Sequence, residues 1–346
     1  MGPRPRTRDL GRALAEGQPE GGTVKYLVTG GAGYIGSIVA TMLLEAGHDV
    51  VVLDDCSTGA AERVPAGATL VRRPVQEVAE VLDGSFDGVL HFAGLIAAGE
   101  SMEKPEIYWE ANTNGTFALL AAMREAGVRT LVFSSTAAVY GNPLEVPIKE
   151  DAVKAPTSTY GATKLSSDMA IQSEATAHGL AAVSLRYFNV VGAYRDRAGV
   201  WHGENHEPET HIIPIAFDAA SGRRESFAIF GDDYPTPDGT CVRDYIHVAD
   251  LAEAHLLALG AAAPGEHKIY NLGNGNGFSN KEVVAVVKEV TGTDFPVLVG
   301  PRRAGDPAEL VASSERARTE LGWKPSRDGL DRMVADAWEY YRHARR

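Results

Sequence analysis

The stretch VTGGAGYIG, at residues 28–36, decides the fold. The apolar run before it reads as a strand, and the pattern after it reads as a helix. Its glycines follow the spacing Gly30-x-x-Gly33-x-x-Gly36. Glycines in such a turn allow a tight bend and let backbone N–H groups approach a pyrophosphate, which the helix N-terminus also attracts. The stretch therefore predicts a dinucleotide site between a strand and a helix.

Short apolar runs alternate with helical patterns up to residue 189. Short runs that are almost wholly apolar are typical of parallel strands buried on both faces. Alternating strands and helices favour an α/β fold, here a Rossmann-like doubly wound parallel sheet. The predicted strands are residues 24–29, 49–54, 69–71, 88–91, 130–134 and 182–186, and the predicted helices are residues 34–46, 75–82, 108–126 and 158–177.

From residue 190 the composition changes. Residues 190–208 and 226–244 are rich in glycine and charged residues, which predicts loops and turns. Helical patterns follow at residues 247–259, 280–291 and 329–342, and Ser279 with Glu282 resembles a capping box. We therefore predict a dinucleotide-binding domain at residues 24–189 and a smaller C-terminal substrate-binding lobe at 190–346. The helix at 247–259 and a strand at 267–271 are expected to return to the main sheet. Residues 1–23 are basic and then polar, and we expect a disordered leader there.

Charge and composition exclude several classes of protein. With 33 basic and 46 acidic residues the net charge is -13, which disfavours binding to nucleic acid or to an anionic membrane. No apolar run approaches the roughly 20 residues that span a bilayer. Cys56 and Cys241 form no disulfide framework, and no Cys/His spacing suggests a metal site. Two reduced thiols fit a cytoplasmic protein.

Asp54 ends the second predicted strand, after the run Val-Val-Val-Leu. An acid at this position can accept hydrogen bonds from the adenosine ribose and repels a 2′-phosphate. The dinucleotide is therefore predicted to be NAD rather than NADP.

Tyr160 and Lys164 share one face of a predicted helix, because they are four residues apart. An ammonium group and an oxidised nicotinamide near a phenol favour the phenolate, so the pair can act as a general base beside a hydride acceptor. Thr136 follows the strand at residues 130–134, and its hydroxyl could bond the substrate oxygen that loses its proton. These three residues are the predicted catalytic group.

These features together resemble the extended short-chain dehydrogenase/reductase family, and in detail its UDP-galactose 4-epimerase branch. The resemblance runs from about residue 25 to about residue 341. It rests on the glycine stretch and on four more stretches, namely HFAGL at residues 91–95, LRYFN at 185–189, IFGDDY at 229–234 and DGTCVRDYIHV at 238–248. It implies an isomerase that uses NAD to invert C4 of a UDP-hexose through a transient 4-keto sugar. It also implies a homodimer joined through the helices at residues 108–126 and 158–177.

The resemblance implies roles for individual residues. Lys164 would be the modulator of Tyr160 and a ribose ligand. The residues implied to contact NAD are Gly30, Gly33, Tyr34, Ile35, Gly36, Asp54, Phe92, Ala93, Gly94, Asn112, Tyr160, Lys164 and Phe188. The residues implied to contact the UDP-sugar are Thr136, Asn189, His211, Ala228, Ile229, Phe230, Arg243, Arg303 and Asp306.

The chain departs from the family pattern at several positions. Pro74 stands where relatives place an acid that meets adenine, and Ile96 stands where some relatives have a lysine. His211 replaces an asparagine, and Thr136 replaces a serine but keeps the hydroxyl. Leu310 is smaller than the tyrosine of certain relatives, which leaves room for an N-acetylated sugar.

Other activities on the same scaffold stay open. A UDP-N-acetylhexosamine or UDP-pentose 4-epimerase is the main alternative. A nucleotide-sugar 4,6-dehydratase needs an acid beside the strand-end hydroxyl, where this chain has Ala137 and Ala138. A non-enzymatic NAD-binding regulator often lacks the tyrosine or the lysine, and this chain has both.

Overall fold

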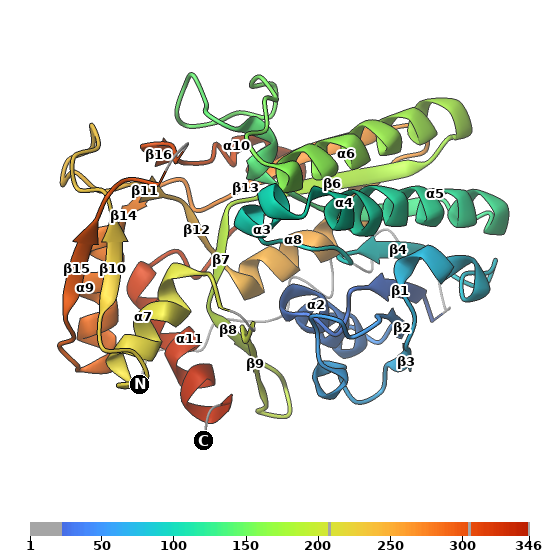
Figure 1. Cartoon of the computed structure of the whole chain (residues 1–346). Helices are drawn as coiled ribbons and strands as arrows, with labels where there is room; N and C mark the ends of the chain where they lie inside the picture. The colour runs from blue at the N-terminus through green and yellow to red at the C-terminus, as the bar shows by residue number, and fades with distance from the viewer. Residues whose placement is uncertain (1–22, 207–208, 304–305, 345–346) are drawn as a thin grey trace.

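A parallel sheet of seven strands forms the centre of the protein, in the order β13-β6-β5-β4-β1-β2-β3 (Figure 1). The computed structural model describes residues 23–206, 209–303 and 306–344, so the predicted leader lies outside it apart from Thr23. Every neighbouring pair in this sheet is parallel, which confirms the predicted fold class. The strands are β1 (Lys25–Thr29), β2 (Asp49–Leu53), β3 (Thr69–Val71), β4 (Gly88–His91), β5 (Thr130–Thr136), β6 (Ala181–Tyr187) and β13 (His267–Leu272).

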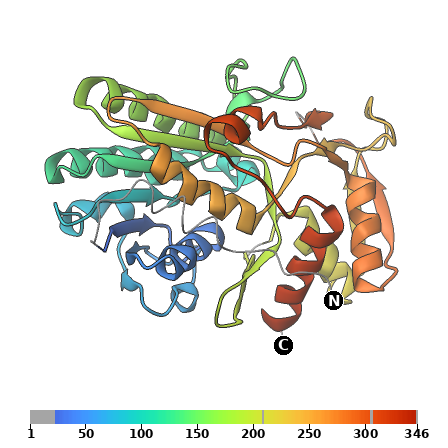
Figure 2. The ribbon, with the colours of Figure 1, turned by 180° about the vertical axis from the view of Figure 1, so that it is seen from behind.

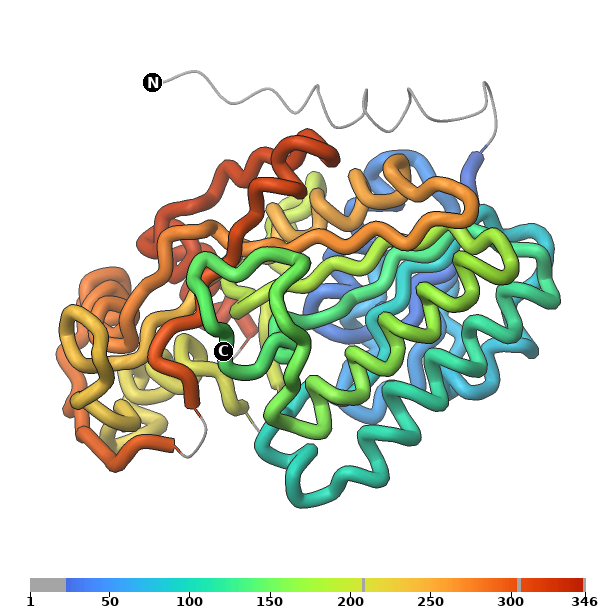
Figure 3. Tube along the Cα trace, turned by 90° about the horizontal axis from the view of Figure 1, so that it is seen from above, coloured from blue at the N-terminus to red at the C-terminus, as the bar shows by residue number. Residues whose placement is uncertain are grey.

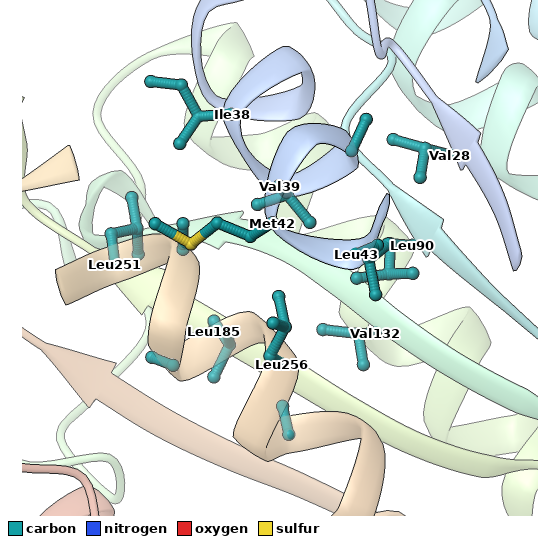
Figure 4. Close-up of a cluster of buried hydrophobic side chains, with 14 of the residues drawn as sticks. Val28, Ile38, Val39, Met42, Leu43, Leu90, Val132, Leu185, Leu251 and Leu256 are labelled. Atoms are coloured by element: carbon teal, nitrogen blue, oxygen red, sulfur yellow. The ribbon is translucent and has the colours of Figure 1, made fainter. Parts of the chain in front are cut away.

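Helices cover both faces of this sheet. Successive side chains of a strand point to opposite faces, and in these strands both sets are apolar and must be buried. Val28, Leu90 and Val132 point to one face, where α2 (Tyr34–Glu45) and α8 (Val248–Ala261) lie. Figure 4 shows side chains of these two helices meeting the strands. Their neighbours Leu27, Val89 and Leu131 point to the other face. That face is covered by α5 (Gly115–Ala126) and α6 (Thr159–His178), which run side by side in Figure 3.

Two predicted helices differ from the prediction. In place of the helix predicted at residues 75–82, the chain forms a 3-10 helix, η2 (Val75–Glu80), that starts after Pro74. The single helix predicted at residues 108–126 is divided into α4 (Pro105–Tyr108), a π-helical turn η3 (Trp109–Asn114) and α5. A π turn inserts an extra residue into the helical repeat, and hydrophobic spacing alone does not reveal it. The short helix α3 (Ala98–Glu103) and the turns η1 (Ala61–Arg63) and η4 (Ala137–Tyr140) complete this part.

The C-terminal lobe is built on three helices that pack together, with a core that includes Phe217, Val283 and Met333. They are α7 (Ile212–Ala220), α9 (Asn280–Thr291) and α11 (Leu330–Ala344), which lie beside the main sheet in Figure 2. The capping box at Ser279 and Glu282 is present at the start of α9, as predicted. A further short helix is α10 (Glu315–Glu320).

Short strand pairs surround these helices, some of them where only loops were predicted. Residues 190–208 and 226–244 hold strands whose partners are, in most pairs, distant in sequence, so local composition did not reveal them. The pairs are β12 (Tyr245–His247) with β7 (Asn189–Val191), β8 (Ala193–Arg195) with β9 (Trp201–Gly203), β10 (Phe227–Phe230) with β15 (Val297–Gly300), and β11 (Val242–Arg243) with both β14 (Phe278–Ser279) and β16 (Glu309–Leu310).

The helix α8 and the strand β13 lie in the layers of the main sheet, although they follow the start of the lobe in sequence. The division of the chain near residue 189 therefore stays a prediction about domains. None of the described helices combines the length and the apolar character that a membrane crossing needs. A cytoplasmic location stays a prediction.

Candidate active site

The glycine turn between β1 and α2 has no room for side chains at two of its positions. Gly30 has φ +74°, and a Cβ on it would lie 2.5 Å from the backbone N of Ala93. A Cβ on Gly36 would lie 2.3 Å from the Gly30 carbonyl oxygen. Gly33 is the N-cap of α2 and makes no side-chain cap, so the first N–H groups of the helix are open to an anion. This turn fits the pyrophosphate of a dinucleotide.

Asp54 lies directly after β2, at the edge of the glycine turn. Its Oδ2 accepts a hydrogen bond from the Ala32 N–H at 2.9 Å, and its Oδ1 accepts one from the Cys56 N–H at 2.8 Å. Burial raises the pKa of Asp54, and the two N–H bonds oppose the rise. Each carboxylate oxygen has further acceptor capacity, so the residue can also receive a ribose hydroxyl.

The loop after β4 connects the glycine turn to α6, which carries Tyr160 and Lys164. Ala93 approaches Gly30, as described above, and Gly94 follows with φ +150°. A Cβ on Gly94 would lie 2.7 Å from Asn112 Oδ1 and 3.6 Å from Lys164 Nζ. Asn112 holds this loop, because its Oδ1 accepts from the Leu95 N–H at 2.7 Å and its Nδ2 donates to the Leu95 carbonyl at 3.0 Å. The loop thus brings the first turn and α6 to one place.

Tyr160, Lys164 and Thr136 meet where β5 ends beside α6. Lys164 Nζ donates to the Ser134 carbonyl at 3.0 Å, and Thr136 Oγ1 accepts from the Ala138 N–H at 3.1 Å. The Thr136 hydroxyl lies close enough to the Tyr160 phenol to lower the pKa of the phenol. The three predicted catalytic side chains are therefore gathered at the carboxyl end of the sheet, where open α/β folds bind ligands.

Burial dominates the acid–base properties of this group. It raises the pKa of Tyr160, and the Thr136 hydroxyl opposes the rise. It lowers the pKa of Lys164 to about 8, while the nearby Asp168 carboxylate works against the shift. The protein alone thus keeps the phenol protonated, and a further positive charge in the site is needed to favour the phenolate.

A second group of charged residues lies in the C-terminal lobe. Arg243 on β11 forms an ion pair with Asp306, and the Arg303 guanidinium lies 4.1 Å from the centre of the Phe230 ring. Asn189 on β7 lies near Arg243, because its Nδ2 donates to the carbonyl of the next residue, Asp244, at 3.0 Å. Guanidinium groups bond phosphate oxygens in pairs, and an aromatic ring beside them can contact a base, so this group of residues could bind a nucleoside diphosphate.

A family model described as "NAD dependent epimerase/dehydratase family" matches residues 26–273. The chain belongs to this family. It is 58% identical to the UDP-glucose 4-epimerase of Streptomyces lividans, over 92% of this chain and 96% of the relative. It is 56% identical to the UDP-glucose 4-epimerase of Corynebacterium glutamicum, over 92% of this chain and 95% of the relative. A crystal structure of UDP-glucose 4-epimerase from Brucella ovis in complex with NAD is 40% identical, with a TM-score of 0.87, over 92% of this chain and 98% of that one.

Some residues implied by the resemblance to this epimerase/dehydratase family do not turn their side chains to the site. Ile229 is buried in the core of the lobe, so only its backbone could reach a base, whereas Ala228 beside it is exposed. The Tyr34 ring is buried and its hydroxyl donates to the Gly192 carbonyl at 2.6 Å. Phe188, in contrast, packs against the cluster that contains Ala137, and so lies next to Thr136.

His211, predicted to contact the substrate, lies against two carboxylates in the structure. Its Nδ1 lies 2.8 Å from Glu204 Oε1 and 3.0 Å from Glu209 Oε1. Burial would lower the pKa of His211, but the two carboxylates raise it to about 10. The ring is therefore engaged with glutamates.

The prediction missed one buried ion pair that supports the catalytic helix. Arg186 Nη2 lies 2.8 Å from Asp168 Oδ2, and both side chains are almost fully buried. Asp168 is four residues after Lys164, on the same face of α6, and this spacing could have indicated it. Arg186 Nη1 also donates to the Tyr140 hydroxyl at 3.0 Å. The pair joins α6 to β6 behind the active site of this epimerase/dehydratase.

We expect Gly36→Ala to weaken NAD binding at least about tenfold. The added Cβ forces the turn apart, and backbone strain of order 1–3 kcal/mol corresponds to about one factor of ten or more in affinity. The NAD content of the purified protein, measured after denaturation and chromatography, tests this. Gly260→Ala on α8 is the matched control, because a Cβ there meets nothing within 4 Å. Equal NAD content in both variants would contradict the expected role of the turn.

Proposed function

We propose that this protein is an isomerase that interconverts UDP-galactose and UDP-glucose by NAD-dependent epimerisation at C4. The observation that carries the proposal is the meeting of Tyr160, Lys164 and Thr136 at the strand ends, next to the glycine turn. Relatives at 58% and 56% identity are UDP-glucose 4-epimerases.

The residues of the chain handle one proton on the sugar. When bound, oxidised NAD would supply the acceptor for the C4 hydride and the positive charge that favours the phenolate. The 4-keto sugar that forms would then be reduced again on its other face. Tyr160 takes the proton of the C4 hydroxyl and later returns it. Thr136 bonds the same oxygen and keeps it in line with the phenol. The Lys164 ammonium donates a hydrogen bond to the Ser134 carbonyl. This bond keeps its positive charge near the phenol and near Gly94.

Inversion requires that the nucleotide be held firmly while the sugar turns. Arg243 and Arg303 bind the diphosphate. Asp306 and Asn189 are the other residues of the lobe that bind the nucleotide. Ala228 and Phe230 frame the base, with the backbone of Ile229 between them. Charge-assisted bonds to the diphosphate are strong, so the nucleotide can stay bound while the hexose turns to present its other face.

Incubation of the purified protein with UDP-galactose, without added NAD, tests the function. We expect UDP-glucose to form, which nucleotide-sugar chromatography detects. Absence of conversion both without NAD and with NAD added would overturn the proposal.

UDP-N-acetylgalactosamine is the second candidate substrate. Leu310 packs with Phe188 against the cluster that contains Ala137, the neighbour of Thr136. A leucine at this place leaves more space than a tyrosine would. The same assay with the acetylated sugar decides the question, since an absence of turnover removes this candidate.

We also propose a homodimer formed through α5 and α6. Phe117 is 46% exposed and Met169 is 64% exposed. Both line one open apolar groove between these helices, together with Leu165 and Ala170. A cluster of large apolar side chains on a surface marks an interaction site.

We expect the double variant Phe117→Glu/Met169→Glu to be monomeric, with a dimer dissociation constant raised at least about tenfold, because buried unpaired charge costs more than 1.4 kcal/mol. Analytical ultracentrifugation over a concentration series measures it. Leu298→Glu, at a residue 57% exposed on β15, is the control and should remain dimeric. Unchanged association of the double variant would remove these helices as the interface.

A further inference from the structure

A cluster of two histidines and two glutamates lies between β9 and α7, outside the groups that act on the sugar. It consists of Glu204, His206, Glu209 and His211, spaced Glu-x-His-x-x-Glu-x-His. Glu204 follows the end of β9, and His211 is the N-cap of α7. One potential ligand atom from each side chain lies within 4.8 Å of the other three.

The distances show that all four groups face one point. His211 Nδ1 and His206 Nδ1 lie 2.8 Å and 3.1 Å from the same oxygen, Glu204 Oε1. Glu209 Oε1 is 3.0 Å from His211 Nδ1. Around a tetrahedral zinc ion with bonds of about 2.0–2.2 Å, ligand atoms are about 3.3–3.6 Å apart. The hydrogen-bonded pairs would therefore open by about half an ångström, and the widest pair would close by about 1 Å, when an ion enters.

The Glu209 carboxylate gives a second, independent indication that a ligand binds at this cluster. Its side chain is only 7% exposed. Within the described ranges, no hydrogen-bond donor reaches its Oε2, which lies 3.9 Å from His206 Nδ1, beyond hydrogen-bond distance. A buried carboxylate oxygen without a donor is costly, and such carboxylates normally pair or coordinate a metal. A metal ion would displace the protons of the two imidazoles, and the cluster would then carry two negative charges, which a dication balances.

We propose that Glu204, His206, Glu209 and His211 form a binding site for a divalent transition-metal ion of the zinc type. Imidazole nitrogens and carboxylate oxygens are ligands that Zn²⁺ accepts in tetrahedral sites, whereas Mg²⁺ and Ca²⁺ prefer oxygen alone. No metal site was predicted from the sequence, because the cluster contains no cysteine and His211 was assigned to the substrate. The site needs neither the proposed sugar substrate nor the epimerase reaction.

The place of the cluster indicates a structural role. The His206 ring meets the Tyr34 ring edge-on, with centres 6.4 Å apart. Arg63 Nη2 donates to the Asn205 carbonyl at 2.9 Å. An ion held here fixes the connection from β9 to α7 against the first turn of α2, where the dinucleotide glycines lie.

Zinc titration of the untagged, NAD-loaded protein tests the site. After dialysis against EDTA and then buffer, isothermal titration calorimetry with ZnCl₂ should give one tight equivalent, and MgCl₂ should not displace it. The melting temperature should rise with Zn²⁺ and fall again with EDTA. His211→Asn should weaken Zn²⁺ binding at least about tenfold, and His206→Gln/His211→Asn should abolish the equivalent, as loss of metal-site groups does elsewhere.

Matched controls separate the site from nonspecific binding and from misfolding. His202→Gln lies on β9 and pairs with Asp196, so it should keep the zinc equivalent. Retained NAD shows that each variant is folded. The proposal fails if the wild type binds no zinc equivalent, in which case the cluster is only a network of charge-paired histidines. It also fails if the double variant binds zinc as the wild type does, in which case the ion lies elsewhere.

Discussion

Replacement of Tyr160 by phenylalanine is expected to lower kcat for UDP-galactose by about 10²- to 10⁴-fold, the usual contribution of a general acid–base group. The phenol lies beside the Thr136 hydroxyl at the end of β5, and phenylalanine keeps the ring but removes the group proposed to accept and return the proton. Because the ring stays, NAD content and melting temperature should change little. Steady-state rates at saturating UDP-galactose measure the effect.

Tyr270→Phe is the matched control for this experiment. The Tyr270 hydroxyl donates to Glu320 Oε2 at 2.9 Å, on β13 and away from the catalytic group. Its loss should leave kcat nearly unchanged. Wild-type turnover by the Tyr160 variant would show that another group moves the proton.

Arg186→Met should lower the free energy of unfolding by about 3–5 kcal/mol, the cost of leaving a buried charge without its partner. Asp168 would retain only the Ser135 hydroxyl, whose Oγ lies 3.2 Å from Oδ2. Its uncompensated charge would also act on Lys164, one turn earlier on α6. Denaturant midpoints of the NAD-loaded protein, together with melting temperatures, measure the loss.

Two further variants identify the cause of that loss. Arg124→Met removes an ion pair with Glu174 in which the arginine is 44% exposed, and it should cost less than about 1 kcal/mol. Asp168→Asn/Arg186→Met should be more stable than Arg186→Met alone, because it leaves no buried charge. Equal losses for Arg186→Met and Arg124→Met would refute the buried-pair account.

The main sheet could be predicted from the sequence because its strands are short apolar runs between helical patterns. Val28, Leu90 and Val132 all lie in such runs, and the glycine turn marks the first crossover. The residues gathered around Tyr160 follow from the same logic, since parallel strands end at one edge of the sheet. The individual roles of the site residues stay predictions.

Features that depend on distant partners could not be predicted in this way. The pairing of β10 with β15 joins two short apolar segments about 70 residues apart, and neither segment shows by itself which strand it pairs with. The π-helical turn η3 depends on how Asn112 meets the loop at Leu95. The carboxylates of Glu204 and Glu209 lie beside His211 only because the connection from β9 folds back against the start of α7, which the sequence alone did not indicate.

The return of β13 to the sheet has a consequence for synthesis of the chain on the ribosome. Until residue 272 has emerged, β6 has a neighbour on one side only, and α2 lacks the apolar surface of α8. A nascent chain that stops short therefore exposes an open strand edge, which invites aggregation. The chain must be nearly complete before its largest core can close, so truncated products should be insoluble and quickly degraded rather than partly active.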